Sequence, residues 1–111
     1  MNVVLKSKKN THYATAEYQN GRIVISKGSR INLYEAYPGM SNSIRCMRND
    51  REIVDKNGVL LQNLEFQSVS SAAVFVTGRS VNGYIAWRID DKISLKEYRA
   101  SQKKLIDVDG Q

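Results

Sequence analysis

The stretch HYATAEYQNGRIVISK, residues 12–27, predicts a β-hairpin. Its centre, Asn20-Gly21, suits a two-residue type I′ turn, because both central residues of that turn take positive φ. A turn of this length also sets the strand register, so Tyr18 is expected to face Ile23. One face of the hairpin is then apolar and should form the core side, with Ala14, Ala16, Tyr18, Ile23 and Ile25.

Capping residues and helical periodicity predict three helices after the hairpin. Ser43, Ser68 and Ser94 are placed as N-terminal caps, and Gly58 and Gly78 as C-terminal stops. We expect helices at 44–56, 69–77 and 95–106, with short strands at 3–5, near 59–66 and at 84–89. The fold class is therefore α+β, a small and largely antiparallel sheet with about three helices.

The chain has 111 residues, which suits one domain over residues 1–111 with a frayed tail at 107–111. Its longest apolar run, residues 72–76, is far below the about 20 residues of a membrane span, and its start lacks the pattern of a signal peptide. One cysteine and one histidine argue against a zinc site and fit a reducing, cytoplasmic setting. We expect no metal, no cofactor and no membrane contact.

The net charge of +6 favours a polyanionic partner such as DNA. Residues 1–56 carry ten Lys/Arg against five Asp/Glu, a balance of +5, whereas residues 57–111 carry seven against six, a balance of +1. A phosphate-binding face is therefore expected mainly from the N-terminal half, at Arg22, Lys27, Arg30, Arg45 and Arg48, with Arg88 added. The alternative is a solvated charged surface, on which Arg48 pairs with Glu52 one helical turn away.

The loop at residues 78–83 is the most site-like segment. Arg79 could bind a phosphate or a guanine edge, Asn82 could bind an adenine edge, and Ser80 lies between them. The alternative is that the loop only connects two elements. Gly78 would then take positive φ, and Asn82 would bond its own backbone.

The strand expected at 84–89 would place Tyr84 and Trp87 on opposite faces. Trp87 would share the core face with Ile85, and Tyr84 would lie beside Arg88. A tyrosine ring next to a guanidinium could stack a nucleobase, or Tyr84 could be an ordinary half-exposed residue.

No arrangement typical of catalysis is present. His12 has no evident acidic or nucleophilic partner, Cys46 fits a small buried apolar residue, and Asp90-Asp91 fits a turn. We therefore expect a protein that is not an enzyme.

Three spaced pieces carry a resemblance: FQSVSSAA at 66–73, TGRSVNGY at 77–84, and Trp87. Together with GRIVISKGS at 21–29, they resemble the uncharacterised domain found C-terminal to GIY-YIG endonuclease domains. The restriction-enzyme and adenine-methylase associated (RAMA) module shares the Ser-Ala-Ala…Gly…Asn-Gly-Trp core. Val69 and Tyr84 depart from the pattern, which has Pro and Trp there, and the nuclease motifs themselves are absent.

The resemblance implies a non-catalytic DNA-binding accessory module that recognises modified DNA in a nuclease or restriction-modification context. The partners would be DNA and a nuclease or methylase domain. The alternative is a protein-interaction or structural module that docks to such a partner, in which case the basic charge is incidental.

Overall fold

The computed structural model describes residues 1–90 and 92–109. In chain order its elements are β1 (Asn2–Lys6), β2 (Tyr13–Gln19), β3 (Arg22–Ile25), α1 (Asn42–Asn49), β4 (Leu64–Phe66), α2 (Val69–Thr77), α3 (Gly83–Ala86), β5 (Arg88–Ile89), β6 (Ile93–Ser94) and α4 (Leu95–Asp109). The strands pair antiparallel in the order β4-β3-β2-β1-β5-β6. The α+β class expected from the sequence is confirmed.

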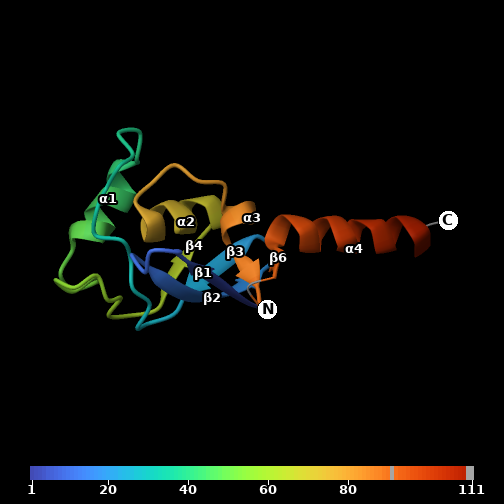
Figure 1. Cartoon of the computed structure of the whole chain (residues 1–111), viewed down its shortest axis with the longest axis horizontal. Helices are drawn as coiled ribbons and strands as arrows, with labels where there is room; N and C mark the ends of the chain where they lie inside the picture. The colour runs from blue at the N-terminus through green and yellow to red at the C-terminus, as the bar shows by residue number, and fades with distance from the viewer. Residues whose placement is uncertain (91, 110–111) are drawn as a thin grey trace.

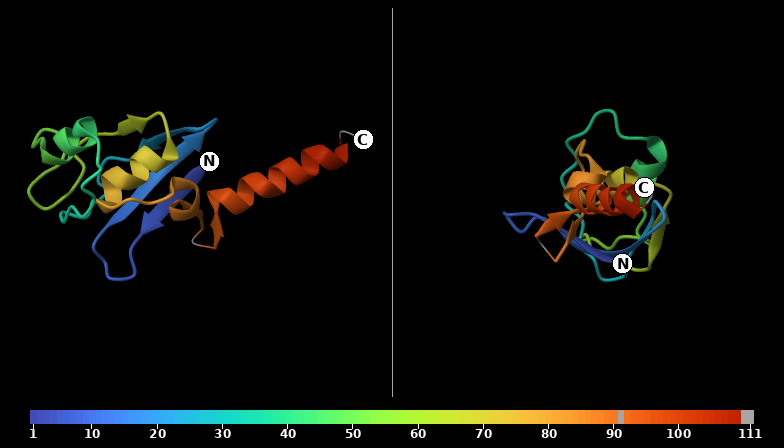
Figure 2. Two further views of the ribbon diagram at one scale, coloured as in Figure 1. Left: turned by 90° about the horizontal axis from the view of Figure 1, so that it is seen from above. Right: turned by 90° about the vertical axis from the view of Figure 1, so that its right-hand side faces the viewer.

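The layers are simple (Figure 1). Helices α2 and α3 lie on one face of the sheet, α1 lies at one end, and α4 leaves the body at the other end. Two further views show the same arrangement (Figure 2). The projecting helix gives the chain an elongated outline, with extents of 53 × 25 × 23 Å.

The hairpin is confirmed together with its register. Tyr18 pairs with Ile23, and the turn residues Asn20 and Gly21 have φ of 53° and 84°. The N-terminal strand is longer than expected and lies inside the sheet, because β1 pairs with β2 along its length and with β5 through Val4 and Arg88.

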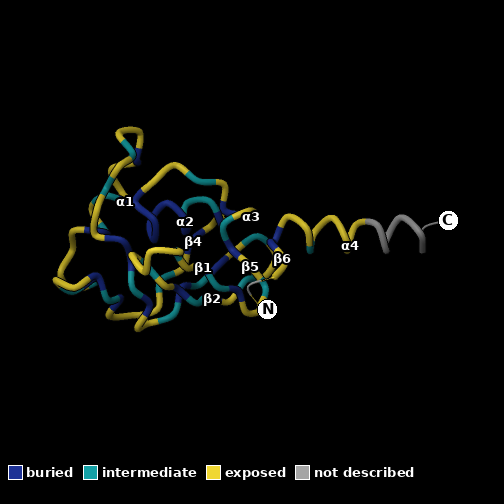
Figure 3. The backbone as a smooth tube through the Cα atoms, in the orientation of Figure 1, coloured by how far each residue is buried: buried dark blue, intermediate teal, exposed yellow. Residues whose placement is uncertain are grey.

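The core lies between the inner face of the sheet and α2. Ala72 and Ala73 are fully buried, and most of the helix is dark blue in a view coloured by burial (Figure 3). Facing them across the core, the strands contribute Val3, Leu5, Ala14, Ala16, Ile23 and Ile25. Trp87 is also fully buried, as expected.

The strand expected at 84–89 is wrong over most of its length. Residues Gly83–Ala86 form the short helix α3, and only Arg88–Ile89 are extended. Asn82 caps this helix, since its Oδ1 accepts the Tyr84 N–H at 3.0 Å. Ile85 consequently does not share the core face with Trp87 and is 47% exposed.

Two other boundaries differ. The helix expected at 44–56 begins after Ser41, whose Oγ accepts the Ile44 N–H, and ends at Asn49. Asp50 ends it, because its backbone is extended and its Oδ1 accepts the Glu52 N–H. In the segment expected as strands at 59–66, only residues 64–66 form a strand, β4. Residues 59 and 60 make isolated bridges.

The last helix is longer than expected. Its capping box is present, because Ser94 Oγ accepts the Glu97 N–H at 3.2 Å. The helix continues to Asp109, so residues 107–109 of the expected tail are helical. The rest of that tail, residues 110–111, lies outside the described residues.

Candidate nucleic-acid interface

The three motif pieces that carry the resemblance meet where α3 lies against the start of α2. The Gly83 N–H donates to Ser70 Oγ at 3.0 Å, and the indole N–H of Trp87 donates to the Val69 carbonyl at 3.1 Å. A Cβ on Gly83 would lie 2.2 Å from the Val69 carbonyl carbon, so only glycine permits this approach. We call Val69, Ser70, Gly83 and Trp87 the α2–α3 clasp.

The other end of α2 is closed by Arg48, which was expected on the surface. Arg48 is 5% exposed, and its guanidinium donates to the carbonyls of Phe75 at 2.6 Å and Asn32 at 2.7 Å. Phe75 belongs to the last turn of α2, whose carbonyls have no partner within the helix. Burial lowers the pKa of Arg48, and Glu35, 3.6 Å from Nε, opposes that change. Arg48 therefore stabilises the fold and does not belong to the predicted phosphate-binding face. The acidic residue near it is Glu35, whereas the sequence had suggested Glu52.

The loop that joins α2 to α3 divides into structural and exposed residues. Gly78 has φ of 71°, and a Cβ there would lie 2.4 Å from the Tyr34 carbonyl oxygen. Asn82 bonds its own backbone as the cap of α3, which is the structural alternative considered above. Arg79 and Ser80 are exposed and remain candidates for contact with a ligand.

The side chain of Tyr84 contacts other residues of the chain. Arg99 of α4 stacks on its ring, with the guanidinium carbon 4.4 Å from the ring centroid. Tyr84 also lies near Tyr18, and the pKa of Tyr18 is raised chiefly by burial and then by this neighbour. The strand that was expected to place Tyr84 beside Arg88 is absent, because residue 84 lies on the helix α3, and the cation on its ring is Arg99.

The cations predicted for one face are dispersed. Arg22 pairs with Gln19 at the last residue of β2. It lies about 20 Å from Tyr13, the first residue of that strand, because a strand rises about 3.4 Å per residue. Lys27 is exposed beyond the other end of β3. Arg45 pairs with Glu35 through Nε at 2.7 Å. The hairpin and α1 therefore do not form the continuous basic surface that their composition suggested.

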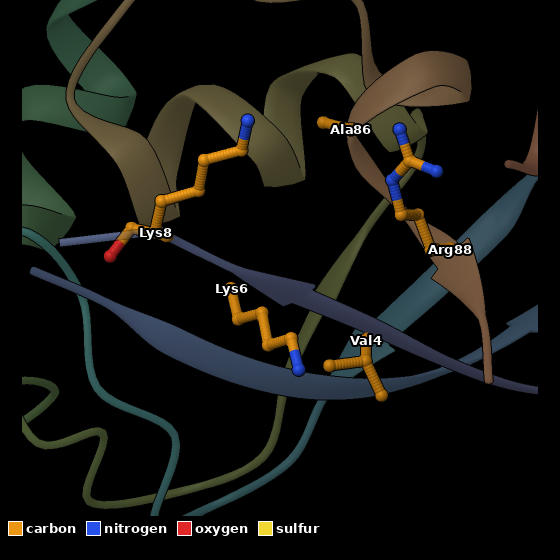
Figure 4. A pocket seen from close by; sticks show the side chains of 6 residues that line it. Val4, Lys6, Lys8, Ala86 and Arg88 are labelled. Carbon is orange, nitrogen blue, oxygen red and sulfur yellow. The ribbon is translucent and has the colours of Figure 1, made fainter. Parts of the chain in front are cut away.

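A different set of cations gathers around the β1–β2 connection. A groove of about 290 Å³ lies between β1 and the α3–β5 segment, lined by Val4, Lys6, Ser7, Lys8, Ala86 and Arg88. Lys8 and Arg88 flank this groove, and Lys6 lies between them along β1 (Figure 4). Three of the six lining residues are basic and none is acidic.

The other end of the β1–β2 connection is also positive. His12 is half-buried there, and its pKa is lowered first by burial and then by the charges of Arg30 and Arg79. Both arginines therefore lie within electrostatic reach of one imidazole, although they are far apart in sequence. We call Lys6, Lys8, Arg30, Arg79 and Arg88 the basic end of the sheet.

Sequence reasoning found three members of this set and missed Lys6 and Lys8. The available signal was local: the first sixteen residues contain three lysines and no acidic residue. The sequence does not show that Arg79 and Arg88 lie near these lysines. Arg88 comes close through the pairing of β1 with β5, and Arg79 through the course of the α2–α3 loop.

The geometry describes a small α+β domain with a cluster of basic residues at one end. Among its described residues no group of three or more His, Cys, Asp or Glu side chains is placed to hold a metal ion. No helix in the described part of the chain has the length and hydropathy that a membrane crossing needs.

Residues 4–99 match the model of a family described as a domain of unknown function, DUF4357, and the chain belongs to that family. A search of curated proteins and a search of solved structures each found no match.

Proposed function

We propose that this domain is a non-catalytic DNA-binding accessory module. The observation that supports it is the basic end of the sheet, where five cations from four separate segments lie at or near the β1–β2 connection. Such an arrangement suits a phosphate backbone, which binds through many lysine and arginine contacts and gains affinity by releasing counterions.

The resemblance to the domain that follows GIY-YIG endonucleases, and to the RAMA module, supports a nuclease or restriction-modification context. In that context the module would bring an associated catalytic domain to DNA, and adenine methylation is the modification to test. The proposal assigns no catalytic residue. Asp90 lies at a turn, and among the described residues the His12 ring forms a hydrogen bond with the hydroxyl of its neighbour Thr11.

The direct test is the binding of labelled duplex DNA, with and without adenine methylation, across a salt series. We expect affinity to fall steeply as salt rises, because each neutralised phosphate releases counterions. Tighter binding of the methylated duplex would support recognition of modified DNA. Absence of binding at low salt would overturn the proposal.

A triple variant, Lys8→Gln with Arg79→Gln and Arg88→Gln, places the test on the basic end of the sheet. The slope of log affinity against log salt should become shallower by about three units if all three contact phosphates. The matched control removes the same charge from Lys92, Lys96 and Lys103, which are exposed in the β5–β6 turn and on α4. Equal losses in both variants would show a nonspecific charge effect and would remove the site from the basic end.

A second candidate function, docking to a protein partner, is favoured by α4. This helix projects from the body, and Ile85 and Ile93 near its base are 47% and 45% exposed. Such a surface suits a helix-mediated interface. An Ile85→Glu, Ile93→Glu variant should lose affinity for an immobilised GIY-YIG nuclease domain and keep its DNA binding. The opposite pattern would remove this candidate.

A further inference from the structure

One tyrosine stands apart from the other aromatic residues of the chain. Of the six tyrosines, only Tyr13 and Tyr34 are counted among the exposed large side chains, and Tyr13 is the one that lies on a strand. Tyr18, Tyr37 and Tyr84 pack against the core. Tyr13 is 47% exposed, so about half of its surface is open to a ligand.

Tyr13 is flanked by a cation on each side. It lies directly opposite Lys6 of β1 and, on its other side, directly opposite Arg30. Directly opposed residues of antiparallel strands point to the same face, so the three side chains form a row across the sheet. Lys6 and Arg30 are both members of the basic end of the sheet.

The row is rigid in its backbone and at one of its side chains. Tyr13 and Arg30 exchange both backbone hydrogen bonds, at 2.9 and 2.8 Å. The Arg30 guanidinium donates to the Asn10 carbonyl at 3.0 Å and to its side-chain oxygen at 2.8 Å, which fixes its charge at the β1–β2 connection. Little conformational entropy then has to be lost at these positions when a ligand binds.

The row lies on the face of the sheet that faces away from α2. Ala14, the next residue of β2, is fully buried under the helix layer, and neighbours on a strand alternate between faces. No helix of the described residues covers the Tyr13 face (Figure 2). The adjacent pair on this face, Val4 and Thr15, is short, so the larger Tyr13 ring extends beyond it.

We propose that Tyr13 stacks against an unpaired base of bound DNA, while Lys6 and Arg30 attract the phosphates on either side. This inference rests on the proposed function, since it requires that DNA is the ligand. It adds that single-stranded or locally unpaired DNA is bound at the sheet face. Stacking suits this position because an aromatic ring on an open sheet face accepts any base, and flanking cations follow the backbone.

The test compares a short labelled oligothymidine with a duplex, using wild type, Tyr13→Ala, Tyr13→Phe and Tyr34→Ala. Stacking on an aromatic ring contributes about 1–3 kcal/mol per base, so Tyr13→Ala should weaken single-strand binding by roughly ten-fold or more. Tyr13→Phe keeps the ring and should bind as wild type does. Tyr34→Ala, which removes an exposed tyrosine from a loop, should also leave the affinity unchanged.

The outcomes separate the two proposals. If wild type binds both DNAs and Tyr13→Ala binds the single strand as tightly as wild type, stacking is overturned and the proposed function stands. If wild type binds neither DNA at low salt, both are overturned. Should Tyr13→Ala unfold, ring-proton NMR shifts of wild type decide: oligothymidine should move the Tyr13 signals upfield and leave those of Tyr34 in place. Unmoved Tyr13 signals in the bound state would overturn the stacking.

Discussion

The α2–α3 clasp and the basic end of the sheet differ in the chemistry of the residues that they bring together. In the clasp, the motif residues donate and accept hydrogen bonds among themselves, and a Cβ has no room at Gly83. At the basic end, Lys6, Lys8 and Arg88 line one groove, and the charges of Arg30 and Arg79 both act on His12. A set of residues held by its own contacts serves the fold, whereas a cluster of like charge suits an oppositely charged ligand. The most recognisable motif of this sequence therefore supports the structure, and the better candidate site lies beside it.

The clasp should be the part of the molecule most sensitive to substitution. Gly83→Ala should destabilise the fold by about 3 kcal/mol, because the new methyl group would overlap the Val69 backbone. Thermal melting measures this change. The control is Gly28→Ala, where the Cβ meets nothing within 4 Å and only the positive φ costs about 1–2 kcal/mol. A smaller loss at Gly83 than at Gly28 would show that α3 is free to move away from α2.

The packing of α2 on the sheet should be sensitive as well, though less so. Ala73→Leu should destabilise by roughly 1–3 kcal/mol through overpacking, because Ala73 is fully buried. DNA affinity per folded molecule should stay the same, since this face does not reach the basic end of the sheet. An unchanged melting temperature would mean that the helix does not lie tightly on the strands.

The basic end should respond in the opposite way. Arg79 is exposed, so Arg79→Ala should leave the melting temperature nearly unchanged and weaken DNA binding. A phosphate contact would lower the salt slope by about one unit for every sequence, whereas a base contact would cost about 1–3 kcal/mol on a preferred site only. Melting and titration on two duplexes distinguish these results. An early-melting variant that binds normally would assign Arg79 to the fold.

The smallest effect is electrostatic and concerns His12, the one histidine of the chain. Its pKa should lie below the ordinary 6.5, because burial and then the charges of Arg30 and Arg79 disfavour the protonated ring. The unfolded chain then takes up a proton first as pH falls, so stability present above pH 6.5 is lost as pH falls through the lower folded-state pKa.

An NMR titration of the imidazole measures this directly. Arg79→Gln should raise the His12 pKa toward 6.5, and Arg88→Gln, which is not among the charges acting on the ring, should not. Bound phosphate would also raise the pKa, so DNA affinity should increase as pH falls through this range. A His12 pKa at or above 6.5 in the free protein would contradict the placement of Arg30 and Arg79.

The sequence predicted those features that depend on neighbours in the chain. Asn20-Gly21 set the turn and register of the hairpin, and the spacing of small and branched residues between Ser68 and Gly78 defined α2. The predicted strand was wrong at residues 83–86, where the alternation of apolar residues had indicated extended structure. A cap at Asn82 and close backbone contact with α2 instead produced one helical turn, and a tertiary contact of that kind overrides a pattern of four residues.

The sequence by itself determined the class of the fold, the hairpin and the caps, because turn geometry and capping are set within a few residues. The tertiary structure decided which charged residues are available to a ligand. Arg48 and Arg79 are the same type of residue. Arg48 is buried and bonds the end of α2, whereas Arg79 is exposed to solvent and its charge acts on His12. Their difference follows from where the chain returns in space, because a guanidinium is buried only when distant carbonyls and carboxylates are brought to it.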